Sequence, residues 1–341
     1  MRVRRTLEYI QAARWLVLIT SLLILTSCST IFSNNTLPAK KALTLKAPIV
    51  SSGCGKPISI IPGTSVNETL ISSGLMRSYR LHIPLGYRDT VAQPLVLNFH
   101  GHGSTSLAQE HLTDFSVLAD QQDFIVAYPQ GIIGPDHLSG WATGIPRNPH
   151  VNDVLFVSNL LNHLQTTFCI DPHRIYATGF SNGGGMTNLL ACTLADRIAA
   201  FAPVSGAYPQ VPGGCHPVRP VPILEFHGTA DTVVPYTGSL VKGYPPIAQW
   251  LAQWVMLDGC TNGPILSLQQ RQVVEEQWTD CRDDATILHY RIIGEGHRWP
   301  TPGLLSGQSS RNRKNADNSI NATALIWSFF QAHPLYAIRK A

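Results

Sequence analysis

The chain has 341 residues, of which 44% are apolar and 13% are charged, and its formal net charge is +4. This composition excludes a largely disordered protein, because so many apolar residues can form a packed core. Four arginines near the start, set against Glu8, account for +3 of the charge. The rest of the chain therefore lacks the basic field of a protein that binds nucleic acid, and we expect no such partner.

The N-terminus has the pattern of an export signal. After the basic start, the apolar run from Leu16 to Leu25 is too short to span a membrane but suits the hydrophobic region of a signal peptide, with a buried helix as the alternative. The residues up to Cys28 resemble the lipobox of bacterial lipoproteins. We predict a lipoprotein signal peptide over residues 1–28, lipidated at Cys28, or ordinary secretion with nearby cleavage. The protein would be exported, and either lipid-anchored to the outer face of the bacterial cell membrane or extracellular.

The remaining chain reads as a tether and one domain. Residues 29–52 are rich in Ser, Thr, Asn, Pro and Lys without periodicity, which predicts a flexible tether. Over residues 53–341, short apolar runs alternate with helical patterns, which predicts a single α/β domain with a mostly parallel central sheet and helices on both faces. The predicted strands are 79–83, 95–99, 124–127, 174–178, 199–204, 223–226 and 286–292, the first forming an antiparallel edge. The predicted helices are 107–120, 151–168, 183–195, 247–257 and 316–331.

Six cysteines follow Cys28, and an even number is typical of a disulfide framework in an exported protein. Six cysteines allow about 15 pairings. Cys260 and Cys281 bracket a strand-like run, residues 265–278, so we expect these two to pair, while buried free thiols are the alternative. No two of the six have metal-ligand spacing, and we expect no metal.

A glycine loop follows the second predicted strand, where His100, Gly101, His102 and Gly103 stand in succession. An α/β hydrolase places there the loop that donates one N–H to the oxyanion, and we assign this role to the main chain of His102. The loop contains neither of the glycine patterns that cradle nucleotides, so we expect no cofactor.

The strongest motif is the run from Gly179 to Gly183, which follows one predicted strand and precedes a helical pattern. It matches the G-x-S-x-G nucleophile elbow, in which a tight turn requires small residues on both sides of the serine. Ser181 is the predicted nucleophile, and the main-chain N–H of Asn182 is the second predicted oxyanion donor. A glycine-rich turn without chemistry is the alternative.

Two later loops supply an acid and a base. Asp231 follows the strand at 223–226, and His297 follows the last strand, which gives Ser, Asp and His in the chain order of α/β hydrolases. Glu225 is a rival acid, but a side chain inside a strand is worse placed to reach a histidine. We therefore predict a catalytic triad that hydrolyses esters through an acyl-enzyme. Three nearby aromatic residues either wall the substrate site or pack internally: Trp299, Tyr236 and Tyr208.

Four segments together, 100–103, 179–186, 226–236 and 296–300, resemble the polyhydroxybutyrate depolymerase and feruloyl esterase group of secreted bacterial esterases, which includes LpqC-like lipoproteins. The resemblance covers residues 53 to 335. It implies the α/β-hydrolase fold and two more disulfides, Cys54–Cys169 and Cys192–Cys215, beside Cys260–Cys281. His102, where the group often has cysteine, and Glu295, within its usual run of glycines, lie at the mouth of the site, so substrate preference does not transfer.

The expected function is that of an exported serine carboxylic-ester hydrolase, acting on aromatic (feruloyl-type) or acetyl esters of polysaccharide. The alternatives are hydrolysis of polyhydroxybutyrate or its oligomers, peptide cleavage by the same triad, and a non-catalytic surface binding protein. An additional domain for binding solid polymer would need more length than this chain has. The expected partners are the ester substrate and, through the lipid anchor alone, a membrane; we expect a monomer.

Overall fold

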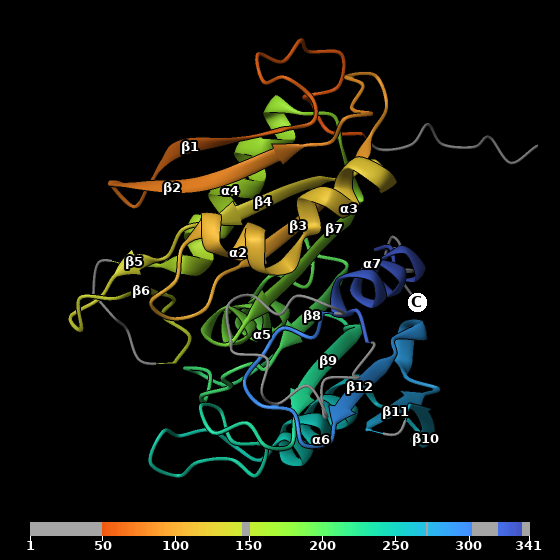
Figure 1. The fold of residues 1–341 in the computed structure, drawn as a ribbon. Coiled ribbons are helices and arrows are strands. Elements are labelled where there is room, and N and C mark those ends of the chain that lie inside the picture. Colours follow the sequence, from red (N-terminus) through yellow and green to blue (C-terminus); the bar gives the residue numbers. More distant parts are fainter. Residues whose placement is uncertain (1–49, 145–150, 271, 302–319, 336–341) are drawn as a thin grey trace, which may run out of the picture. The chain divides into compact units, whose positions relative to one another are not determined.

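The computed structural model describes residues 50–144, 151–270, 272–301 and 320–335 (Figure 1). All of them belong to the unit Pro48–Ala341. The predicted signal peptide, Cys28 and nearly all of the predicted tether lie outside the described residues, so the predicted domain limits stay predictions. Within the described ranges, no helix has both the length and the apolar character that a membrane span requires.

One ten-stranded sheet forms the centre of this unit, in the order β1-β2-β4-β3-β7-β8-β9-β12-β11-β10. Its central strands run parallel to one another. They are β4 (Ile125–Pro129), β3 (Gln93–Phe99), β7 (Ile170–Phe180), β8 (Ala200–Val204), β9 (Ile223–Gly228) and β12 (Ile287–Ile292). Every residue of β3, β4, β8 and β9 is buried, as expected of parallel strands covered on both faces. The predicted mostly parallel sheet is confirmed.

Antiparallel hairpins extend the sheet at both edges. β2 (Leu75–Ile83) was predicted as an edge strand, but β1 (Thr64–Ser72) pairs along its whole length and takes the edge. The predicted strand-like run 265–278 is a hairpin of β10 (Asn262–Gln270) and β11 (Val273–Thr279), and β11 pairs with β12. A separate small hairpin joins β5 (Ile132–Ile133) to β6 (Ser139–Gly140).

Helices cover both faces of the sheet. The predicted helix 107–120 is two helices, α2 (Ser106–Thr113) and α3 (Phe115–Gln122), because Asp114 between them has a left-handed φ of 51°. The others are α4 (Asp153–Thr167), α5 (Asn182–Thr193), α6 (Ile247–Asp258), α7 (Ala322–Ala332) and the short 3-10 helix Arg282–Asp284. Side chains of α4, α5 and α6 form one buried cluster with the sheet, and those of α3 and α7 form a second on its other face.

Three disulfides join Cys54 to Cys169, Cys192 to Cys215 and Cys260 to Cys281. These pairs are the ones that the sequence and the resemblance led us to expect. The second ties α5 to the segment that follows β8, and the third closes the base of the β10–β11 hairpin, beside the paired residues Asn262 and Thr279.

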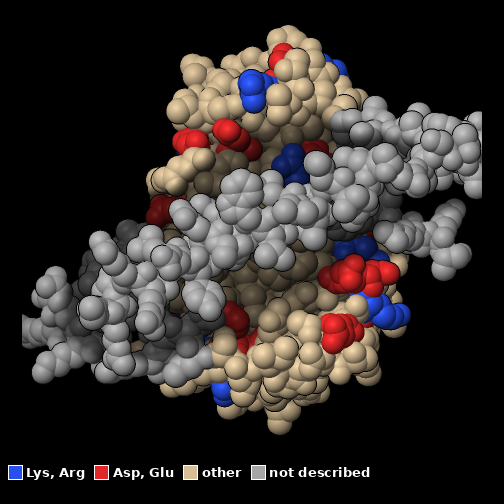
Figure 2. All heavy atoms as spheres, turned by 90° about the vertical axis from the view of Figure 1, so that its right-hand side faces the viewer, with Lys and Arg blue, Asp and Glu red and all other residues tan. Residues whose placement is uncertain are grey.

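On the face drawn in Figure 2, acidic and basic residues are interspersed over a largely uncharged surface.

Candidate active site

Ser181 stands at the turn between β7 and α5, with φ 57° and ψ −116°. This backbone conformation is strained for a residue with a side chain, and such strain persists only where the surroundings enforce it. A Cβ at Gly183 would lie 2.1 Å from the carbonyl oxygen of Phe99, and a Cβ at Gly179 would lie 2.5 Å from the carbonyl oxygen of Gly183. The turn can therefore form only with glycine on both sides of the serine.

The main chain of Ser181 is firmly held, while its hydroxyl is not. Its N–H donates to the carbonyl of Val204 (3.0 Å), and its own carbonyl accepts from the N–H of Ala207 (3.0 Å). The side chain does not cap α5, although the residue stands at the N-cap position. Within the described part of the chain, Oγ has no hydrogen-bond partner, and its bond to His297 is not formed in this structure. Such catalytic bonds often tighten only when substrate is bound.

Asp231 and His297 are in direct contact. Asp231 follows β9 and His297 follows β12, and these neighbouring parallel strands end at the same edge of the sheet. Nδ1 of His297 lies 2.7 Å from Oδ2 of Asp231. The His297 ring lies 4.7 Å, centre to centre, from the ring of Phe180, the residue before Ser181. The structure thus brings the predicted base onto the predicted acid and beside the nucleophile turn.

Asp231 is held in its ionised form. Its Oδ1 accepts hydrogen bonds from the N–H groups of Val233 and Val234, both at 2.8 Å. Burial raises the pKa of this carboxyl, but hydrogen bonds from His227, His297 and Val234 lower it more, to well below its ordinary value. A carboxylate that stays ionised can orient the imidazole of His297 and stabilise its cationic form.

The loops that carry the acid and the base are fastened to each other. The N–H of Ala230 donates to the carbonyl of Glu295 (2.9 Å), and the N–H of Gly294 donates to the hydroxyl of Thr229 (2.8 Å). A Cβ at Gly228 would lie 2.3 Å from the same Glu295 carbonyl, so the close approach depends on glycine. Glu295, which interrupts the glycines expected before the histidine, contributes its main-chain carbonyl to this contact.

The predicted oxyanion donors lie on either side of the nucleophile. A Cβ at Gly101 would lie 3.4 Å from Cβ of Ser181, which places the glycine loop against the serine. In the described ranges, the main-chain N–H groups of His102 and Asn182 donate to no protein atom. The His102 imidazole points elsewhere, with Nε2 2.7 Å from Oδ2 of Asp136. Both N–H groups are thus available to a substrate oxygen.

Trp141 fastens this loop to α5, a feature that the sequence did not reveal. Its main-chain N–H donates to Oδ1 of Asn182 (2.7 Å), and its indole N–H donates to the carbonyl of His100 (2.9 Å). Burial lowers the pKa of His100 to about 4, and the neutral ring accepts the N–H of Gly131 at Nε2 (2.9 Å). The main-chain groups around the predicted oxyanion site are therefore rigid before substrate arrives.

The segment that carries Trp141 rests on a buried ion pair. Asp153 accepts the N–H of Ala142 (2.9 Å) and pairs with Arg77 at 2.7 Å, and the two charged side chains are 1% and 2% exposed. The preceding residue, Asn152, caps α4 by accepting the N–H of Leu155 (2.8 Å). Charged groups are buried only when they are paired, so Asp153 has a structural role.

A second set of buried charges lies beneath the acid. His227 contacts Oε1 of Glu225 through Nδ1 (2.9 Å) and Oδ2 of Asp231 through Nε2 (3.5 Å), and all three side chains are fully buried. His289 lies 2.6 Å from the other oxygen of Glu225. Burial lowers the pKa of His227, but the charge of Glu225 and the hydrogen bonds to both carboxylates raise it to about 10.

Glu225, the rival acid, contacts His227 and His289 rather than His297. The reason that we gave for discounting it was wrong. A carboxylate inside a strand does reach histidines, because side chains two apart on one strand, or opposite one another on neighbouring strands, share a face. His227 is two residues further along β9, and His289 is the register partner of Glu225 on β12. The signal in the sequence was a charged residue within an apolar strand, which must be paired when buried.

The three aromatic candidates for the substrate site all have internal partners. Trp299 is 5% exposed and donates its indole N–H to Thr323 (3.0 Å). Tyr208 donates its hydroxyl to Glu225 (3.1 Å), and the hydroxyl of Tyr236 lies 3.0 Å from Nε2 of His289. These contacts fit internal packing, and a role in walling the substrate site stays a prediction.

The chain is similar to several known proteins. Residues 111–209 match the prolyl oligopeptidase family. Feruloyl esterase B of Piromyces equi is 35% identical over 65% of this chain and 42% of its own length. A bifunctional acetylxylan esterase/xylanase of Neocallimastix patriciarum is 31% identical over 68% of this chain and 32% of its own length. This chain thus spans less than half of either relative.

The fold and the arrangement of the site define an α/β hydrolase. An acetyl xylan esterase from Aspergillus awamori has the same fold, with a TM-score of 0.54 at 18% identity over 70% of this chain and 96% of its own. Feruloyl esterase D of Neurospora crassa is 32% identical over 58% of this chain and 67% of its own length. The chain belongs to the α/β-hydrolase family that contains these feruloyl esterases.

Proposed function

We propose that this chain is an exported serine carboxylic-ester hydrolase that acts on aromatic, feruloyl-type, or acetyl esters of polysaccharide. The observation that carries the proposal is the contact of His297 with the buried, ionised Asp231 (2.7 Å), beside the strained turn that presents Ser181. Relatives named feruloyl esterase and acetylxylan esterase support the substrate class.

In the proposed reaction, Nε2 of His297 takes the proton of Ser181 as Oγ attacks the ester carbonyl. Nδ1–H of His297 meanwhile donates to Asp231, which fixes the tautomer and stabilises the imidazolium. The N–H groups of His102 and Asn182 donate to the oxyanion. His297 then gives the proton to the departing alcohol, and water, deprotonated by the same histidine, releases the acid and restores Ser181.

Export is supported by the three disulfides, which form and persist in oxidising compartments. Lipid anchoring at Cys28 and membership of the group with polyhydroxybutyrate depolymerases and LpqC-like lipoproteins are part of the same proposal. They rest on the sequence alone. A monomeric state is likewise proposed.

The test is hydrolysis of methyl ferulate, p-nitrophenyl acetate, acetylated xylo-oligosaccharides and 3-hydroxybutyrate oligomers. We expect Ser181→Ala to lower kcat on every cleaved ester by about 10⁴-fold or more. Ser59→Ala, an exposed serine without a hydrogen bond to the described residues, is the control and should match the wild type. Preference for the hydroxybutyrate oligomers would replace the substrate class, and folded wild type that cleaves none of the esters would overturn the activity.

A further inference from the structure

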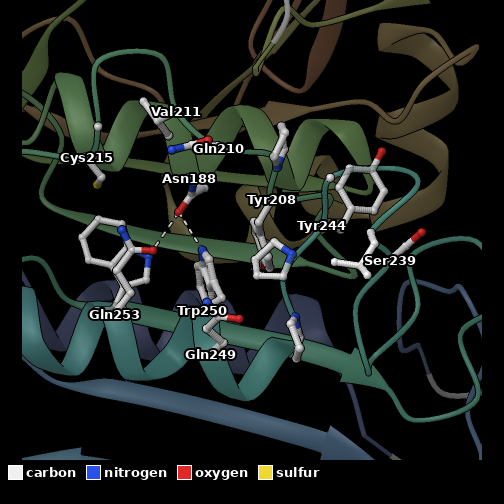
Figure 3. A pocket seen from close by; sticks show the side chains of 17 residues that line it. Asn188, Tyr208, Gln210, Val211, Cys215, Ser239, Tyr244, Gln249, Trp250 and Gln253 are labelled. Carbon is white, nitrogen blue, oxygen red and sulfur yellow. Dashed lines mark hydrogen bonds between the residues drawn. The ribbon is translucent and has the colours of Figure 1, made fainter.

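A pocket lies between α5 and α6, and the segments that follow β8 and β9 close its other sides (Figure 3). Its volume is about 480 Å³, within the range of small-molecule sites. Ser181, Asp231 and His297 are not among the residues that line it. The pocket is therefore a feature of its own and needs its own explanation.

The lining of this pocket is uncharged. It contains no Lys, Arg, His, Asp or Glu, so it offers no partner to a phosphate, a carboxylate or a cation. It instead carries three exposed carboxamides, Gln210 on one wall and Gln249 and Gln253 on α6. None of the three side chains bonds to a residue in the described ranges. Four aromatic residues and three prolines make up much of the rest, beside Asn188, Ser239 and small or aliphatic residues. Such a lining suits a neutral ligand with many hydroxyl groups.

The pocket contains a buried amide, Asn188, that is held in one orientation. The residue is 7% exposed, and its Oδ1 accepts the indole N–H groups of Trp250 (2.9 Å) and Trp254 (3.1 Å), drawn as dashed lines in Figure 3. Two donors on the oxygen fix the orientation of the amide, because its nitrogen cannot accept them. The nitrogen has no partner among the described residues, and the residue lines the pocket. An amide nitrogen that is held in one orientation and has no protein partner can donate to a ligand in the pocket.

One wall of the pocket is a stacked pair of aromatic rings, and α5 connects the pocket to the nucleophile turn. Tyr208 stacks on Trp250, with ring centres 4.1 Å apart. Asn188 lies on α5, seven residues after Ser181, which stands at the N-cap of this helix. Seven residues correspond to a rise of about 10 Å along the helix axis. Tyr208 directly follows Ala207, whose N–H donates to the Ser181 carbonyl. The separation along α5 is comparable to the length of two sugar units, so we place one unit in the pocket and the esterified unit at Ser181.

We propose that this pocket is a subsite for a neutral sugar unit of the polysaccharide that bears the ester, with Asn188 and the three glutamines as its hydrogen-bond partners. The inference rests on the proposed function, whose substrate it narrows from esters of polysaccharide to esters on an uncharged polysaccharide. It assigns binding of the glycan chain to α5 and α6, and the chemistry to the triad.

The experiment titrates xylotetraose, a neutral oligosaccharide without esters, into the protein in a calorimeter. We expect the double variant Gln249→Ala/Gln253→Ala to raise Kd about tenfold, since it removes two sets of amide hydrogen bonds. Gln210→Ala, on the opposite wall, repeats the test without altering α6. The matched control is Gln121→Ala, an exposed glutamine of α3 outside the pocket, which should leave Kd unchanged.

Hydrolysis of methyl ferulate and p-nitrophenyl acetate by the wild type is measured alongside. Ester cleavage without xylotetraose binding, or binding that the glutamine variants do not weaken, would overturn the subsite and leave the proposed function intact. Binding that depends on the glutamines, in a protein that cleaves no ester, would support the subsite and refute the hydrolase.

Discussion

Gly183 is the position at which the smallest change should do the most damage. In Gly183→Ala the new Cβ would lie 2.1 Å from the Phe99 carbonyl oxygen and 2.6 Å from that of His100, roughly 1 Å short of tolerable contact. Both obstacles are main chain, so the turn itself must move. We expect a loss of about 1–3 kcal/mol in the free energy of unfolding. A shift of about 1 Å between Ser181 and the oxyanion donors should lower kcat about 10²-fold.

Gly296→Ala is the matched control, because the same methyl group there, next to His297, meets no atom within 4 Å. Both variants are assayed for p-nitrophenyl acetate hydrolysis and for urea unfolding followed by circular dichroism. Gly296→Ala should resemble the wild type in both assays. If Gly183→Ala did so too, the turn would not be as tightly packed as its contacts indicate, and the reasoning on the nucleophile elbow would be wrong.

Other positions test other parts of the site. Asp231→Asn should keep the fold and lower kcat about 10⁴-fold, because an amide favours the wrong tautomer of His297; a kcat within tenfold of wild type would exclude Asp231 as the acid. Glu225→Gln should lower the free energy of unfolding in urea by about 3–5 kcal/mol above pH 4.5, since it removes the carboxylate that lies nearest to the buried His227. Burial raises the pKa of Glu225, but the charges of His227 and His289 lower it from 4.5 to about 2, so this contribution is present above pH 4.5 and is lost as the pH falls towards 2. The difference in unfolding free energy between variant and wild type should shrink as the pH falls from 4.5 towards 2. A constant difference would contradict the claim that Glu225 is ionised in the folded protein. The double variant Cys54→Ala/Cys169→Ala should lower the free energy of unfolding by about 2–5 kcal/mol. This loss should exceed that of Cys260→Ala/Cys281→Ala, because the first disulfide closes a loop of 115 residues and the second a loop of 21. Equal losses would argue against an account based on loop entropy.

The sequence predicted the candidate triad because each of its members is tied to a local pattern. Ser181 lies in a turn whose glycines are obligatory, and Asp231 and His297 each follow a short apolar strand. Carboxyl ends of parallel strands meet at one edge of a sheet, so the order of motifs along the chain was sufficient to expect a common site. Cys260 and Cys281 could be paired from sequence neighbourhood alone, whereas the other two disulfides needed the resemblance to a family.

Features set by register or by distant contacts could not be predicted. The partnership of Glu225 with His289 depends on the alignment of β9 with β12, which no local pattern encodes. The clamp of Trp141 on Asn182 joins residues 41 positions apart. The break between α2 and α3 at Asp114 was missed because the apolar spacing continues across it. β1 was missed because its mixed polar sequence, half exposed at the edge, lacks the apolar run of a central strand.

The buried charges beneath the triad act on Asp231 as one group. Glu225 and Asp231 are both fully buried carboxylates, and His227 touches both of them. Because the pKa of His227 is about 10, it stays cationic at neutral pH and offsets one of the two negative charges. A single net negative charge remains among these three residues, and His289 lies beside the other oxygen of Glu225. Without His227 the two carboxylates would repel each other in a dry environment, and one would take up a proton. Asp231 can therefore remain ionised beside an apolar sheet because β9 carries a glutamate and a histidine that a core strand would otherwise exclude.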